Sequence, residues 1–297
     1  MFESESNPIS DPIIFYFAGG PGCSSILTLL FENGPYQLDN QKIRLMKNDN
    51  RWSKISNIVY VDQPPGTGFS YSDSFFNYAR DNENVADYMY SFLIKFFQKY
   101  PQFSLSPVFI MGDSFAGQFI PTICAKILQK NEEKNPKPEM IININGAAIG
   151  GGWTSPLIQY GSLADYAFQK GLISIFSREA LDLYWYSCKG MIASGVWELA
   201  VTECNMILNA ILSETGVCSN DIRKNCTWNE DSELDYSRVF EFLEQRGVRR
   251  DLNVGSHTWS SCSEVVKTYM STESLNDVTD KVEGKKNNIL FSFHYLD

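Results

Sequence analysis

The chain of 297 residues is 43% apolar and 20% charged, as expected for a soluble globular protein. Its formal net charge of −10 argues against nucleic acid or an anionic membrane as a partner. It has no apolar run of about 18 residues, so we expect no membrane span. The length is sufficient for one large hydrophobic core or two smaller ones.

Short apolar runs predict four buried strands, at 12–17, 58–62, 107–111 and 139–149. Apolar residues at helical spacing predict a helix at 83–100, which Pro101 ends. A second helix is expected at 115–129, although Pro121 would kink it. A last strand is expected at 285–293. Strands that alternate with helices indicate an α/β fold with a mostly parallel central sheet.

The strand signals stop at about residue 175. From there to about residue 245, helical stretches, cysteines and acidic segments replace them. This change predicts a helical cap inserted into an α/β core. We therefore expect a core at 1–174, an inserted cap at 175–245 and a return to the core at 246–297.

The predicted cap contains four cysteines: Cys188, Cys204, Cys218 and Cys226. Their spacing does not match a zinc framework, and the chain has only two histidines to contribute ligands. Disulfides are the better interpretation, with the pairing left open, and they imply an oxidising compartment. Asn225 begins the one Asn-x-Ser/Thr sequon and is a candidate glycosylation site. Cys124, in the helix expected at 115–129, is predicted to be free and buried.

The start of the chain does not match these secretory features. Residues 1–12 have neither the basic segment nor the apolar segment of a signal peptide. The middle of the chain has the disulfide and glycosylation signals of a secreted protein, but its start has no signal peptide. This mismatch suggests that the ends of the chain are not its natural ends.

The segment GDSFAG at 112–117 has the features of a nucleophile elbow. In an elbow, a strand ends in a strained turn and a helix follows, so that the serine hydroxyl stands clear of the backbone. Ser114 lies between the strand predicted at 107–111 and the helix predicted at 115–129. Small neighbouring residues would let other backbone segments approach closely. Ser114 is therefore the candidate nucleophile.

The glycine-rich segment AGGPGCSS at 18–25 follows the first predicted strand. Acyl transfer builds an oxyanion in its transition state, and two backbone N–H donors typically stabilise it. The candidate donors are Gly20 in this segment and Phe115, which follows the serine. An ordinary tight turn is the alternative. A phosphate-binding loop is disfavoured because no Lys-Ser/Thr pair follows the glycines.

Several motifs occur together and in order: ESESNP, DPIIFYFAGGPGCSS, FENGPY, VYVDQPPGTGFSYS, GDSFAG and GGWTSPLIQYGSLADYAFQKGLIS. In this combination the chain resembles the serine carboxypeptidase family, a group of α/β-hydrolases. The likeness is dense over residues 2–172 and looser at 246–269. It implies release of C-terminal residues from peptides or proteins, without a metal or cofactor, in the vacuole, lysosome or extracellular space.

The resemblance also implies roles for individual residues. Ser114 would form the acyl-enzyme, with Gly20 and Phe115 as oxyanion donors. Substrate binding, including that of the C-terminal carboxylate, would involve Gly19, Glu32 and Asp113. Two carboxyls that share a proton near that site would be protonated only at low pH, since like charges raise a pKa.

A long-range disulfide between Cys23 and Cys262 would hold the glycine-rich loop, again by resemblance to the family.

Two positions depart from the pattern of the family's peptidases. Ala18 stands where asparagine is usual, and Asp113 where glutamate is usual. The shorter acid resembles a plant acyltransferase branch that transfers an acyl group from a glucose ester to an alcohol. Ala116 is closer to the peptidase form. We therefore expect a carboxypeptidase, with an acyltransferase or a non-catalytic relative as alternatives.

The histidine that would act as general base is missing from the expected place. His257 is interpreted as a surface or packing residue, and His294 stands where the family has glycine. Asp297 is a candidate for the acid of the triad. The family's catalytic histidine would lie beyond Asp297, and its first strands before Met1. We therefore expect a truncated chain, with the core incomplete at both ends and little activity on its own.

Overall fold

The computed structural model describes residues 1–297 except 40–41, 135–138, 227–235, 282–289 and 295–297. The chain divides into two compact units. The first unit contains residues 1–154, 236–270 and 278–297, and the second contains residues 155–235 and 271–277.

The first unit is built on a parallel sheet with the strand order β4-β1-β5-β6-β7. Its strands are β1 (Ile13–Phe17), β4 (Asn57–Tyr60), β5 (Val108–Asp113), β6 (Ile144–Gly150) and β7 (Leu290–His294). The predicted parallel sheet is confirmed, and each strand overlaps a predicted apolar run. Residues 285–289 of the last run lie outside the described residues.

The run predicted as a strand at 139–149 begins as a strand only at Ile144. Just before that strand, a side chain holds the backbone at Ile142. The Asn131 side-chain amide donates to the Ile142 carbonyl at 2.8 Å and accepts from the Ile142 N–H at 3.0 Å. The strand is therefore shorter than predicted, and the residues before it are only partly buried, since Ile142 is 1% exposed but Ile141 is 54% exposed.

Strand β1 shows how the sheet directs its residues to two cores. Ile13, Phe15 and Phe17 pack in the large cluster that also contains residues of the two long helices. Ile14 and Tyr16 pack in a second cluster, on the opposite face, as expected because successive strand residues alternate. A strand buried on both faces reads as a continuous apolar run, and IIFYF does so.

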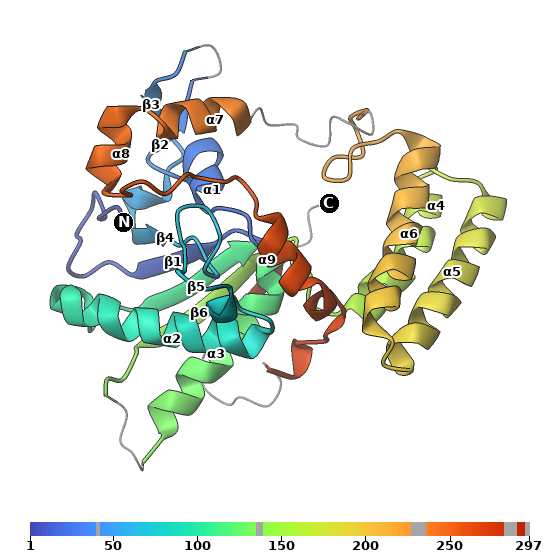
Figure 1. Ribbon diagram of the computed structural model, residues 1–297, viewed down its shortest axis with the longest axis horizontal. Helices are drawn as coiled ribbons and strands as arrows, with labels where there is room; N and C mark the ends of the chain where they lie inside the picture. The colour runs from blue at the N-terminus through green and yellow to red at the C-terminus, as the bar shows by residue number, and fades with distance from the viewer. Residues whose placement is uncertain (40–41, 135–138, 227–235, 282–289, 295–297) are drawn as a thin grey trace. The chain divides into compact units, whose positions relative to one another are not determined.

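Two long helices pack against each other and against the sheet (Figure 1). Helix α2 (Asn82–Lys99) begins after Asp81, whose carboxylate accepts from the Asn84 N–H at 2.6 Å. Helix α3 (Ala116–Glu132) runs three residues beyond the predicted end and contains Pro121 in its second turn. Cys124 in this helix is free and buried, as predicted.

Shorter elements complete the first unit: α1 (Ile26–Phe31), β2 (Tyr36–Leu38), β3 (Leu45–Lys47), α7 (Tyr236–Leu243), α8 (Arg246–Leu252) and α9 (Glu264–Tyr269). Strands β2 and β3 form a separate antiparallel pair. Helices α1 and α7 share one apolar cluster with Leu38 and Trp259. This cluster joins segments that are about 200 residues apart in the chain.

The second unit contains three helices, α4 (Pro156–Gln169), α5 (Ile175–Ala193) and α6 (Trp197–Thr215). It starts at 155, whereas the cap was predicted at 175–245, because α4 packs against both α5 and α6. Disulfides join Cys188 to Cys204, between α5 and α6, and Cys218 to Cys226. Among the described residues, no helix is both long and apolar enough to cross a membrane.

Phe15 provides a test of the large core. Its ring has no solvent exposure and meets the rings of α2 edge-on at centroid distances of 5.2–6.2 Å. We expect Phe15→Ala to lower the free energy of unfolding by about 3–5 kcal/mol, because it leaves a cavity among close-packed rings. Phe76→Ala is the matched control, since that ring is 89% exposed. Urea denaturation measures both, and equal losses would contradict this packing.

Candidate active site

The backbone at Ser114 has the strained geometry of an elbow. Ser114 has a φ of +55°, a conformation that residues other than glycine rarely adopt. It lies between the end of β5 at Asp113 and the start of α3 at Ala116. Its N–H donates to the Gly150 carbonyl at 2.9 Å, and its carbonyl accepts from the N–H groups of Gly117 and Trp153, both at 3.0 Å. Three backbone hydrogen bonds thus stabilise the turn.

The Ser114 side chain is exposed, and its hydroxyl has no hydrogen-bond partner in the described part of the chain. Close backbone contacts explain the small residues around it. A Cβ at Gly112 would lie 2.2 Å from the Phe17 carbonyl oxygen, and one at Gly117 would lie 2.7 Å from the Trp153 nitrogen. These contacts leave the serine hydroxyl free to react while fixing the backbone that carries it.

The glycine-rich loop at 18–25 lies directly against the elbow. A Cβ at Gly19 would lie 2.5 Å from the Phe115 nitrogen and 2.7 Å from the Ser114 Cβ. Gly20 has a φ of +113°, which favours glycine. Neither the Gly20 N–H nor the Phe115 N–H donates to an acceptor within the described residues, although Phe115 is only 5% exposed. Two free donors beside a free hydroxyl suit the oxyanion of acyl transfer.

A second segment anchors this loop. Cys23 and Cys262 form a disulfide, the pair that the family resemblance implies, with their Cα atoms 3.9 Å apart. Two backbone hydrogen bonds flank it, from the Ser24 N–H to the Ser261 carbonyl at 2.8 Å and from the Ser263 N–H to the Gly22 carbonyl at 2.9 Å. The loop is therefore held on the side opposite to the elbow as well.

Two carboxyl groups lie near the nucleophile. Asp113 precedes Ser114, and burial together with the negative charge of Glu32 raises its pKa from 3.8 to about 7. Partial desolvation also raises the pKa of Glu32, which follows the last residue of α1 and is reached by solvent. The Tyr16 hydroxyl donates to Asp113 at 3.2 Å. Near neutral pH Asp113 therefore holds a proton for part of the time, whereas an ordinary aspartate would have lost it.

Tyr236, at the start of α7, joins this group, and no feature of the sequence pointed to it. Its pKa is raised by burial and by the charges of Glu32 and Asp113. Its ring packs 6.2 Å from that of Phe31, the neighbour of Glu32. Tyr236 follows residues 227–235, which lie outside the described part, and only folding brings it to the site.

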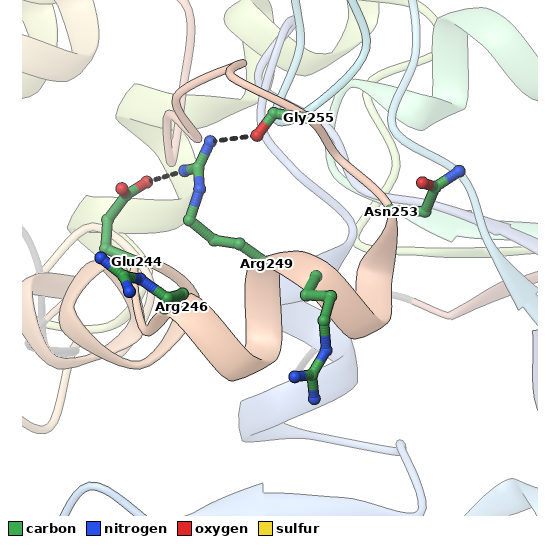
Figure 2. Close-up of a pocket in the computed structure, with 6 residues that line it drawn as sticks. Glu244, Arg246, Arg249, Asn253 and Gly255 are labelled. Carbon is green, nitrogen blue, oxygen red and sulfur yellow. Dashed lines mark hydrogen bonds and ion pairs between the residues drawn. The ribbon is translucent and has the colours of Figure 1, made fainter.

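His257 does not contact the nucleophile in this structure. Its ring stacks on Tyr71 at a centroid distance of 3.3 Å. Arg249 fixes the segment that carries it, since it pairs with Glu244 and donates to the Gly255 carbonyl at 3.0 Å (Figure 2). It also donates to the His257 carbonyl at 2.8 Å. The cavity of about 500 Å³ beside Arg249 contains none of the predicted site residues. The packing role predicted for His257 agrees with these contacts.

The other predicted residues are not brought to the nucleophile by any described contact. His294 ends β7, where its backbone pairs in register with Gly150. Asp297 lies outside the described residues. Asn225 is an exposed residue of the second unit, in a bridge with Val217 beside the Cys218–Cys226 disulfide.

Comparisons with known proteins agree with this geometry. The sequence model of the serine carboxypeptidase family matches residues 1–292. Serine carboxypeptidase-like 47 of Arabidopsis thaliana is 37% identical over 97% of this chain, and serine carboxypeptidase 3 of Hordeum vulgare is 36% identical over 94%. A prohormone-processing carboxypeptidase from Saccharomyces cerevisiae has a solved structure that matches 99% of this chain with a TM-score of 0.85 and 25% identity.

The parallel sheet, the elbow and this structural match define an α/β-hydrolase. More narrowly, the chain belongs to the serine carboxypeptidase family. The chain spans 57% of the length of the Arabidopsis relative, 55% of the Hordeum relative and 67% of the yeast chain.

The raised pKa of Asp113 predicts a specific pH dependence of stability. A carboxyl with a folded-state pKa of about 7 and an ordinary value of 3.8 binds its proton more tightly in the folded state. Its contribution to stability is therefore complete below about pH 4 and is lost as the pH rises towards 7. We expect Asp113→Asn to match the wild type at pH 4 and to exceed its unfolding free energy at pH 8 by about 2–4 kcal/mol.

Asp11→Asn is the matched control for this measurement by urea denaturation. Hydrogen bonds from Ser4 and Asn7 lower the pKa of Asp11, so its loss should destabilise the protein at pH 8. An Asp113→Asn protein that is no more stable than the wild type at pH 8 would contradict the assigned environment.

Proposed function

We propose that the protein, as produced from its complete gene, is a serine carboxypeptidase that releases C-terminal residues through an acyl-enzyme on Ser114. The observation that carries this proposal is the contact of Gly19 with the Ser114 turn, which brings the next residue, Gly20, close to Ser114, where the N–H groups of Gly20 and Phe115 have no acceptor among the described residues. Phe115 is only 5% exposed, and a buried N–H without an acceptor costs free energy unless a reacting group uses it.

The proposed reaction has two steps. The Ser114 oxygen attacks the carbonyl carbon of the last peptide bond, and the carbonyl oxygen becomes an oxyanion that accepts from Gly20 and Phe115. The C–N bond then breaks as the leaving nitrogen receives the proton that the general base took from Ser114, so the C-terminal amino acid leaves and the acyl group stays on Ser114. Water attacks the ester in the same way, which releases the shortened peptide and restores the serine.

A general base must take the Ser114 proton. Among the side chains that the structure describes, the one imidazole is that of His257, and it is stacked on Tyr71. We therefore assign the base to no described residue.

The carboxyl pair supports an exopeptidase that works in acid. A protonated Asp113 or Glu32 can donate a hydrogen bond to the carboxylate at the end of a peptide, whereas two ionised groups would repel it. The raised pKa values of both groups extend the protonated form to higher pH than isolated carboxyls would allow. Activity should then fall as the pH rises above about 7.

An acyltransferase is the second candidate, and two positions favour it. The methyl side chain of Ala18 cannot donate to a carboxylate, and Asp113 is one methylene shorter than the glutamate usual in the peptidases of the family. Both changes weaken recognition of a free C-terminus. A glucose ester carries no carboxylate at that place, so an acyltransferase would not need groups that recognise one.

The three disulfides fit an oxidising compartment. We therefore propose that the protein enters the secretory pathway, with a vacuolar, lysosomal or extracellular destination. Glycosylation at Asn225, which is exposed, is part of this proposal.

The test compares three substrates with the complete gene product: an N-blocked dipeptide, the same dipeptide as its C-terminal amide, and a glucose ester with an alcohol acceptor. We expect release of the last amino acid from the free dipeptide and little from the amide. Ser114→Ala should reduce the rate by about 10⁴-fold or more, while Ser10→Ala, at an exposed serine, should not change it.

Transfer from the glucose ester without hydrolysis of the dipeptide would instead establish the acyltransferase. A folded protein that does neither would be a non-catalytic member of the family.

A further inference from the structure

The carboxyl group of Asp62 occupies an unusual position beside the glycine-rich loop. It accepts from the Ser24 hydroxyl at 2.7 Å, the Ser25 N–H at 2.9 Å and the Phe69 N–H at 3.0 Å. The backbone closes around it, since a Cβ at Gly68 would lie 1.9 Å from Asp62 Oδ2. Burial raises its pKa, while the three hydrogen bonds lower it. Within the described residues it has no cationic partner.

Through Ser25, this carboxylate acts on both ends of the loop at 18–25. The Ser25 hydroxyl accepts from the Ala18 N–H at 2.9 Å and donates to the Val61 carbonyl at 2.7 Å. The first and last residues of the loop are thereby joined, and Asp62 fixes the residue that joins them. Ser24 and Ser25 are themselves at most 1% exposed, so no solvent replaces these bonds.

Ser24 extends the network to the far segment of the chain. Its hydroxyl accepts from the Trp259 indole N–H at 2.9 Å, while its own hydrogen goes to Asp62. Trp259 is 3% exposed and lies three residues before Cys262 of the disulfide. The loop is thus tied to Asp62 on one side and to the disulfide segment on the other.

An aspartate suits this place because all three of its partners are donors. Asparagine would turn an NH₂ group toward one of them and lose that hydrogen bond. A buried carboxylate without a cation is also costly. A group of this kind, kept beside a candidate oxyanion loop, indicates a function beyond packing, because such local conflicts concentrate at functional sites.

We propose that Asp62 is a positioning residue of the oxyanion hole, which holds the 18–25 loop so that the Gly20 N–H stays beside Ser114. This inference rests on the proposed function. Asp62 touches no reacting atom and acts through Ser24 and Ser25. Because the oxyanion exists only in the transition state, loosening the loop should lower kcat and leave KM nearly unchanged.

The test is Asp62→Asn in the complete gene product, with Asp11→Asn as the matched control. Asp11 also accepts from a serine hydroxyl and a backbone N–H, but it precedes β1, whereas the loop follows β1. We expect Asp62→Asn to lower kcat for the blocked dipeptide by about 10- to 100-fold, with KM within about twofold of the wild type. Asp11→Asn should leave both constants unchanged. A kcat for Asp62→Asn equal to that of Asp11→Asn would overturn the proposal.

If Asp62→Asn does not fold, Ser25→Ala tests the same proposal. It removes the link between Ala18 and Val61 with a smaller change in burial, and the same split between kcat and KM is expected. An unchanged kcat in a folded Ser25→Ala protein would overturn the proposal as well.

A third readout does not depend on activity. Amide hydrogen exchange at Ala18, Cys23 and Ser24, whose N–H groups are hydrogen-bonded, should be faster in Asp62→Asn than in Asp11→Asn. If the wild-type protein hydrolyses no substrate, the proposed function is wrong. Amide hydrogen exchange alone then tests the role of Asp62. Equal exchange in the two variants would refute that role.

Discussion

The close approach of Gly19 to the Ser114 turn is the contact on which the site depends. A side chain at Gly19 would collide with the Phe115 nitrogen, so only glycine lets the loop lie there. The contact brings the Gly20 N–H, the Phe115 N–H and the Ser114 hydroxyl into one small region, and none of the three has a partner in the described residues. Close glycine contacts, backbone hydrogen bonds and the Cys23–Cys262 disulfide hold this region in place.

The parallel sheet makes this arrangement possible. The glycine-rich loop follows β1, the segment with Asp62 follows β4, and Ser114 follows β5, and these three strands are neighbours. Parallel strands end at the same edge of a sheet, which is where such folds place their functional groups. Burial and the charge of Glu32 then raise the pKa of Asp113, beside the nucleophile, to about 7.

Much of the first unit could be predicted from the sequence, because strands buried on both faces leave continuous apolar runs and the elbow has a local signature. Contacts made through the fold left no such signal. The pairing of Cys188 with Cys204 depends on helix packing, and the second unit starts at 155 because α4 packs on its neighbours. Tyr236 and the donors around Asp62 come from distant segments, so spacing alone could not assemble them.

The central claim is that Ser114 is the nucleophile of an acyl-transfer site, and covalent labelling tests it most directly. The complete gene product would be treated with a fluorophosphonate at acidic pH, digested, and analysed by mass spectrometry. The structure leads us to expect one stoichiometric adduct on Ser114, and none in the Ser114→Ala protein. A folded protein that takes no label, or takes it on another serine, would contradict the account.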